Sequence, residues 1–237
     1  AALLLAVAVG ILTGLCTGLL HTKFGIPAIL AGILTQFALY SINLRIAGKA
    51  NLPIFSKETI FENAFLESVV PEALDPYLVS IILFVIVLVC KILLDLFLKT
   101  RAGYLLRAVG DNEVLVTSLA KDKGMVKILG LALANGFVAL AGCVYCQQKG
   151  FFEVSTGTGT MVIGLASVII GTKLLKRFHS VKATTAVIFG SIVYKACVSL
   201  AIALGMAASD LKLITAVLFL IILVASNRKE RKVKAHA

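Results

Sequence analysis

Only a few side chains in this sequence could do chemistry, and most of them lie in apolar surroundings. Lys195 is near the middle of a long apolar run, where a charge costs at least about 2.5 kcal/mol on insertion scales. Lys91 and Asp95 are four residues apart and can neutralise each other on one helix. Cys143 and Cys146 form a C-x-x-C, which in an apolar helix favours packing over redox chemistry. Lys195 alone has no partner on its own segment, so a pathway role and a structural role are equally supported.

Catalytic motifs are absent from the sequence. It has no G-x-x-x-x-G-K-[ST], no H-E-x-x-H and no nucleophile elbow. The three histidines are isolated from one another in polar segments. We therefore expect no enzyme activity, no cofactor and no metal site, and the chain cannot hydrolyse ATP alone.

Other polar residues in or beside apolar runs could line a pathway for a polar solute. Gln36, Tyr40 and Asn43 share one helical face through their i, i+4, i+7 spacing. The stretch "STGTGT" interrupts a later run with glycine, as transporters do where a helix breaks around a pathway. Hydrogen bonds between helices would account for such residues almost as well, so both interpretations stay open. The candidates are Gln36, Tyr40, Asn43, Asn135, Ser155, Thr156, Thr158, Tyr194 and Lys195.

The elements that must position these residues are seven predicted membrane spans. The chain is 59% hydrophobic and 15% charged, with a mean hydropathy of +1.01. These values place it in a bilayer and exclude a soluble globular protein. We expect an all-α polytopic helical bundle that forms a single transmembrane domain over residues 1–237. The predicted spans are Ala1–Leu20, Ile26–Ile42, Tyr77–Leu98, Val126–Cys146, Gly157–Leu175, Thr184–Met206 and Leu211–Ser226.

The first span carries a double G-x-x-x-G, formed by Gly10, Gly14 and Gly18. Lipid tails are as apolar as leucine, so membrane helices associate through close packing, which small residues allow. We expect this glycine face to pack against another helix.

Basic residues predict the orientation of the spans. With strict alternation, sixteen Lys and Arg residues fall on one side of the membrane and five on the other. The positive-inside rule then places the basic side and the C-terminus in the cytoplasm. The net charge of +11 thus reflects the loops. No aromatic residues are interleaved with the basic ones, so we expect a lipid bilayer as partner and no nucleic acid.

The longest loop on the opposite side, residues 43–76, contains a predicted amphipathic helix. In "SKETIFENAFLESV", Phe61, Phe65 and Val69 share one face, and Ser56 can cap the first turn. The pattern predicts an interfacial helix on the outer surface. Its role is either to cover the bundle or to dock an external partner.

The cytoplasmic segment "RAVGDNEVLVTSLAKD", residues 107–122, is helix-prone although it joins two spans. Asp111 or Asn112 can cap a helix here, and Glu113 suits its positive first turn. A short helix that is apolar on one side can rest in a groove of a soluble partner. A membrane domain without its own ATPase could be moved in this way by an ATPase outside it. The small apolar face is formed by Leu115, Val116 and Leu119.

The same segment, extended to "RAVGDNEVLVTSLAKDKGMVKILGLALANGFVALAG", resembles the coupling-helix region of ABC importer permeases of the branched-chain amino acid and ribose type. "GIPAILAGILTQFALYSINLRIAGKANLP", "GTGTMVIGLASVIIG", "GSIVYKA" and "SDLKLITA" are similar to one subgroup, whose members have been linked to tryptophan or related amino acids. The resemblance covers nearly the whole chain. It implies a multi-pass permease subunit of a bacterial plasma membrane, which forms the translocation path for a small solute, an amino acid.

The resemblance also implies partners. They are a second permease subunit, expected to form a homodimer, a cytoplasmic ABC ATPase and an extracytoplasmic substrate-binding protein. Permeases of this family have spans before the position of Ala1, so the resemblance implies that N-terminal spans are missing from this sequence. The residues it assigns to ATPase coupling are Asp111, Asn112, Glu113, Leu115, Val116, Leu119 and Ala120.

Two other classes of protein would share the pattern of spans. A secondary transporter driven by an ion gradient would need a carboxylate relay within its spans. The spans offer only Asp95, which Lys91 can match. A structural membrane scaffold would leave the capped cytoplasmic helix without a use. The sequence therefore favours the ABC permease, with the secondary transporter as the alternative.

Overall fold

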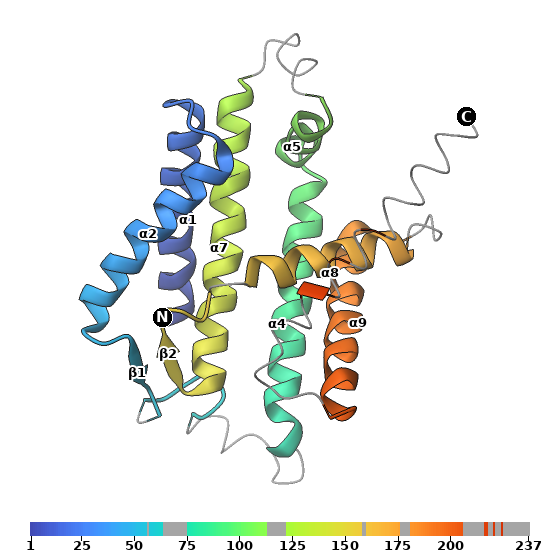
Figure 1. The fold of residues 1–237 in the computed structure, drawn as a ribbon. Coiled ribbons are helices and arrows are strands. Elements are labelled where there is room, and N and C mark those ends of the chain that lie inside the picture. The colour runs from blue at the N-terminus through green and yellow to red at the C-terminus, as the bar shows by residue number, and fades with distance from the viewer. Residues whose placement is uncertain are drawn as a thin grey trace. The chain divides into compact units, whose positions relative to one another are not determined.

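The computed structural model describes residues 1–55, 57–63, 75–112, 122–157, 160–175 and 181–205, together with residues 216, 217, 220 and 224. Nearly all secondary structure in these residues is helical, which confirms the predicted all-α class (Figure 1). The chain divides into two compact units, Ala1–Val154 and Ser155–Ala237, and each is described here by itself. A single domain over the whole chain stays a prediction.

The first unit is built from long apolar helices and two short strands. Its helices are α1 (Ala2–Thr22), α2 (Ala28–Ala47), α4 (Asp75–Leu98), α5 (Arg101–Asp111) and α7 (Lys123–Lys149), and its strands are β1 (Asn51–Pro53) and β2 (Phe151–Glu153). The second unit contains α8 (Thr160–Leu175) and α9 (Ala183–Ala203).

Five of the helices in the described residues are long and apolar enough to cross a membrane. They are Ala2–Thr22, Ala28–Ala47, Tyr77–Leu98, Lys123–Lys149 and Ala183–Ala203. Five of the seven predicted spans thus correspond to observed helices, with bounds that differ by a few residues. The predicted span Leu211–Ser226 lies almost wholly outside the described residues.

The predicted span Gly157–Leu175 corresponds to helix α8, which begins three residues later than predicted. Helix α8 begins at Thr160, whose hydroxyl donates to the carbonyl oxygen of Gly157 at 2.7 Å. Its 16 residues reach about 24 Å at 1.5 Å per residue, less than a hydrocarbon core of about 30 Å. The glycine-containing stretch before it, Ser155 to Gly157, forms a turn instead of a helical extension.

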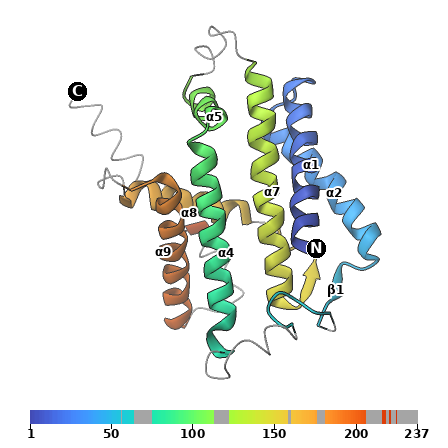
Figure 2. The ribbon, with the colours of Figure 1, turned by 180° about the vertical axis from the view of Figure 1, so that it is seen from behind.

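The main contact of the first unit is between α1 and α7, which run side by side in Figures 1 and 2. Gly10, Gly14 and Gly18 are all buried on α1. A Cβ atom on Gly14 would lie 2.5 Å from the carbonyl oxygen of Leu131 and 2.6 Å from the Cα atom of Ala132. The two backbones therefore approach more closely than any other residue type would allow, and the predicted glycine packing face is confirmed.

Two short strands, which the sequence did not indicate, join the segments that follow α2 and α7. Strands β1 and β2 pair antiparallel, with Leu52 opposite Phe152. Each strand follows a helix that ends at a glycine in the left-handed conformation, Gly48 at φ 70° and Gly150 at φ 72°. These two turns reverse the chain at the same end of the unit, so the strands meet.

The prediction of an interfacial helix is wrong for the part of its range that the structure describes. Residues 57–63 form turns and bends instead of a helix. The hydroxyl of Thr59 accepts hydrogen bonds from the backbone N–H groups of Phe61 and Glu62, at 3.2 and 3.0 Å. The N–H of Ile60 donates to Oε1 of Gln147 on α7 at 3.0 Å. The side chains of Thr59 and Gln147 thus accept hydrogen bonds from N–H groups that a helix would use, and the bond to Gln147 anchors the segment to α7. Ser56, Phe65 and Val69 lie outside the described residues.

In the second unit, α8 and α9 also pack through glycine. A Cβ atom on Gly190 would collide with the backbone oxygen of Ser167 and would lie 2.5 Å from the backbone nitrogen of Gly171. A Cβ atom on Gly171 would in turn collide with the backbone oxygen of Ala186. Around this crossing lies a small buried cluster of Ala166, Ile170 and Tyr194.

We predict that Gly14→Ala destabilises the first unit by about 1–3 kcal/mol, because the added methyl group overpacks a contact with backbone atoms. The measurement is unfolding of the purified chain in mixed micelles by a denaturing detergent. Gly32→Ala on α2 is the matched control, since no atom lies within 4 Å of the added methyl group. Both variants gain the same helix propensity. If the two variants unfolded at the same midpoint concentration of the denaturing detergent, the assigned packing of Gly14 against α7 would be contradicted.

Candidate pathway and coupling residues

The three polar residues of α2 keep the common face that their spacing predicts. Gln36, Tyr40 and Asn43 all lie on α2 and are exposed within the first unit. Their exposed polar groups need a polar environment if α2 spans a membrane. The face is thus open to water, to another part of the protein or to a second copy of it.

Asn135 lies instead in the close contact between α1 and α7. Its Nδ2 donates to the carbonyl oxygen of Leu131 on its own helix at 2.9 Å. Its backbone oxygen is the nearest neighbour of a Cβ atom built on Gly10, at 2.5 Å. These contacts are those of helix packing, and a pathway role for Asn135 stays a prediction.

A polar link between helices in this unit was missed at the sequence level. The hydroxyl of Thr17 on α1 lies 3.0 Å from the hydroxyl of Thr35 on α2 and donates to it. Thr35 also donates to the carbonyl oxygen of Ala31 at 2.9 Å. Thr17 lies beside Gly18 on the small-residue face of α1, and this position could have indicated a hydrogen bond to a neighbouring helix. This hydrogen bond joins α2 to α1 at the residue before Gln36.

The remaining pathway candidates fall in the second unit. Ser155 and Thr156 lie in the turn before α8, and Thr158 lies outside the described residues. Tyr194 is buried, with 2% of its surface exposed, while Lys195 is exposed on the same helix. These residues belong to the second unit, and their convergence with those of α2 and α7 stays a prediction.

The predicted ion pair on α4 is present. Lys91 Nζ lies 3.1 Å from Asp95 Oδ2, one helical turn along. Asp95 is the only carboxylate within the five long apolar helices of the described chain. Because a basic residue holds it, the described spans contain no carboxylate relay of the kind an ion-driven transporter uses.

A helix that was not predicted from the sequence precedes the coupling segment. Asp111, predicted as a possible cap of the coupling helix, is the last residue of α5, and Asn112 follows it with extended backbone, φ −154° and ψ 101°. The predicted coupling helix itself lies outside the described residues. Helix α5 begins after Thr100, whose side chain accepts from the N–H of Gly103 at 3.3 Å. The signal was present in "TRAGYLLRAVGD": a capping threonine precedes apolar residues at helical spacing.

The other coupling candidates lie outside the described residues: Glu113, Leu115, Val116, Leu119 and Ala120. Both ends of their segment are well anchored. Val109 of α5 is buried, and Asp122 caps α7 by accepting from the N–H of Gly124 at 2.8 Å. Helix α5 also contacts α7.

Comparisons with known proteins cover most of the chain. The sequence profile described as "Branched-chain amino acid transport system / permease component" matches residues 1–226. A tyrosine transport system permease protein of Clostridioides difficile (strain R20291) is 46% identical over 226 residues, which are 95% of this chain and 72% of that protein. An uncharacterized protein of Rickettsia prowazekii (strain Madrid E) is 30% identical over 236 residues, which are 97% of this chain and 80% of that protein.

A shorter similarity joins the chain to another importer. The autoinducer 2 import system permease protein LsrC of Salmonella paratyphi B (strain ATCC BAA-1250 / SPB7) is 37% identical over 76 residues, 32% of this chain and 22% of that protein. No solved structure matches the chain.

These matches agree with the long apolar helices and explain why the sequence lacks catalytic motifs. They describe a multi-pass membrane protein that transports and does not catalyse, and whose family implies an ATPase partner. The chain belongs to the family of branched-chain amino acid transport system permease components, the membrane subunits of ABC importers.

Proposed function

We propose that this permease forms the translocation path for an aromatic amino acid, of the class to which tyrosine and tryptophan belong. The observation that carries the proposal is the 46% identity, over 95% of the chain, to a protein named a tyrosine transport system permease. The resemblance of several motifs to the subgroup linked to tryptophan supports the same class. The exposed polar face of α2, with Gln36 and Tyr40, offers groups that could contact such a solute.

The proposed assembly contains two copies of the permease, a cytoplasmic ABC ATPase and an extracytoplasmic binding protein that delivers the substrate. The basic loops and the C-terminus face the cytoplasm, as the positive-inside rule predicts. The coupling segment, residues 113–121, then faces the ATPase.

The described geometry offers a physical route for coupling. The coupling segment joins the end of α5 to the capped start of α7. Helix α7 packs backbone against backbone on α1, so the two move as one rigid pair. A displacement of the segment by the ATPase would be passed through α7 to α1 and α2, and it would thereby reach the polar face of α2.

Uptake into proteoliposomes tests the substrate class. We predict that the permease, reconstituted with its ATPase and binding protein, accumulates labelled tyrosine when ATP is supplied. Excess unlabelled tryptophan should compete, whereas leucine should not, because selection for a ring leaves a branched aliphatic side chain with less buried area. Equal competition by leucine would contradict the aromatic class while leaving the permease function intact.

Cysteine labelling in sealed cells tests the orientation. In a version without native cysteines, we predict that Glu67→Cys reacts with a membrane-impermeant reagent added outside. Lys176→Cys should react only after the membrane is opened, since it belongs to the basic side. Reaction of position 176 in sealed cells would overturn the proposed orientation.

Leu119→Asp tests the coupling segment. Burial of a leucine in a partner groove contributes roughly 1.5–3 kcal/mol, and a charge placed there costs more. We predict that the variant inserts normally but neither co-purifies with its ATPase nor transports. Gly110→Asp is the matched control, because it adds the same charge at an exposed position with no atom within 4 Å. Normal ATPase binding by Leu119→Asp would refute the assignment.

A further inference from the structure

Helix α5 lies across the ends of two spans. It begins at Arg101, and only two residues separate it from the last residue of α4, Leu98. It contacts both α4 and α7. In Figures 1 and 2, α5 is viewed nearly along its axis, whereas α4 and α7 run from top to bottom. A helix in this position lies at the level of the bilayer surface.

The two faces of α5 suit such a surface. Gly103 and Val109 are buried towards the unit. On the opposite side, Arg101, Tyr104 and Arg107 follow one another at intervals of three residues and are all exposed, Tyr104 by 60%. Arginine and tyrosine combine an apolar body with a polar end, so they are stable where lipid tails meet headgroups.

Basic charge is in excess around α5. Lys99, Arg101 and Arg107 are exposed, and no carboxylate in the described part of the chain forms an ion pair with any of the three. Among the residues that the structure describes, the acidic ones nearby are Asp111 and Asp122, and Asp122 accepts from the N–H of Gly124. A basic cluster at the end of a span attracts anionic lipid headgroups.

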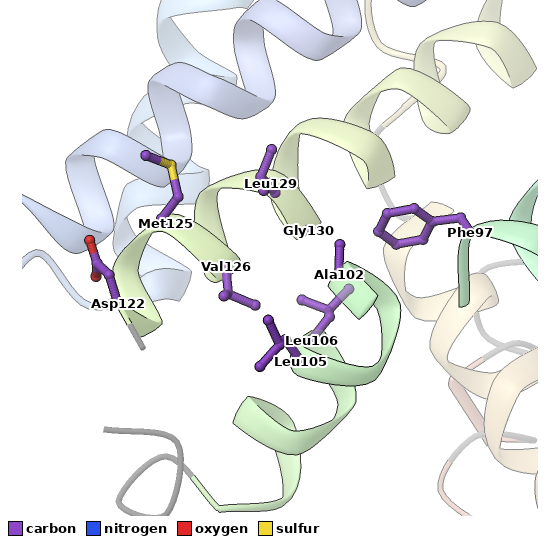
Figure 3. Close-up of a pocket in the computed structure, with 9 residues that line it drawn as sticks. All are labelled: Phe97, Ala102, Leu105, Leu106, Asp122, Met125, Val126, Leu129 and Gly130. Carbon is purple, nitrogen blue, oxygen red and sulfur yellow. The ribbon is translucent and has the colours of Figure 1, made fainter. Parts of the chain in front are cut away.

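An apolar cavity of about 270 Å³ lies beside this basic face, between α5 and α7 (Figure 3). Leu105 and Leu106 of α5 line one side, Val126 and Leu129 of α7 the other, and Phe97 comes from the end of α4. Asp122 is the only charged residue in the lining. A cavity with so few polar groups does not hold water well, whereas a hydrocarbon chain fits its chemistry.

We propose that this site binds an anionic phospholipid, with its phosphate at Arg101 and Arg107 and an acyl chain in the cavity between α5 and α7. The apolar cavity beside the basic face favours a lipid over an acidic protein surface, which would use only the charge. This lipid site goes beyond the proposed transport function. Only the choice of leaflet rests on that proposal, because the proposed orientation places the site in the cytoplasmic leaflet.

Lipid retention by the intact chain tests the site. The permease is placed in nanodiscs of equal parts phosphatidylglycerol and phosphatidylcholine, and native mass spectrometry counts the lipids that stay bound. We expect phosphatidylglycerol to be retained preferentially. Arg101→Gln with Arg107→Gln should lower its affinity about 30-fold, which corresponds to about 1 kcal/mol for each basic residue. The matched control, Arg45→Gln with Lys49→Gln, removes two exposed charges elsewhere and should change nothing.

Two more variants separate charge from cavity. Arg101→Lys with Arg107→Lys keeps the charge and should retain the lipid. Ala102→Leu fills the cavity without changing charge and should lower retention of both lipids.

No preference for phosphatidylglycerol, or equal losses in the glutamine variant and its control, would overturn the proposal. So would a glutamine variant that keeps the lipid but loses the ATPase, because the basic face would then belong to a protein partner. The lipid count requires neither transport nor a known orientation, so its failure is distinguishable from failure of the transport proposal.

Discussion

The close approach of helix backbones is the constraint on which both units depend. Inside a membrane, lipid competes with every apolar side chain, so helices gain little from burying leucine against leucine. Contact between backbones is what remains, and it requires residues without side-chain bulk. Gly14 meets the backbone of Leu131 and Ala132, and Gly190 meets that of Ser167 and Gly171. The rest of each unit is arranged around these two contacts.

Rigidity follows from such contacts, and it is useful in a transporter without an ATPase of its own. Packed interfaces of this kind do not deform gradually, so a force applied at one end of α7 moves α1 with it. At the opposite end of α7, Gln147 holds Ile60 by a hydrogen bond of 3.0 Å, and Gly150 continues into β2. The strands and the turn at residues 57–63 are thereby attached to the same rigid pair.

The sequence predicted what depends on composition and local spacing, and missed what depends on partners distant in the chain. Span lengths, the α1 glycine face and the Lys91–Asp95 pair follow from patterns within one segment. The β1–β2 pairing could not be predicted, because it joins segments about a hundred residues apart. The expected helix at Phe61 failed partly for the same reason, since the distant Gln147 accepts from the N–H of Ile60, while the neighbouring Thr59 accepts from that of Phe61. Helix α5 was not predicted, although Thr100 and the apolar spacing after it offered a local signal.

The position of α5 has a mechanical consequence for the coupling segment. A segment of nine residues between two fixed ends transmits force only if those ends resist it, and a helix floating in water would not. Helix α5 resists such a force because its Val109 is buried and its Leu106 packs against Gly130 of α7. Its exposed Arg101, Tyr104 and Arg107 face the bilayer surface, which cannot be pushed through at low cost. In the proposed coupling mechanism, motion imposed on residues 113–121 is therefore directed into α7, whose capping residue Asp122 follows the segment.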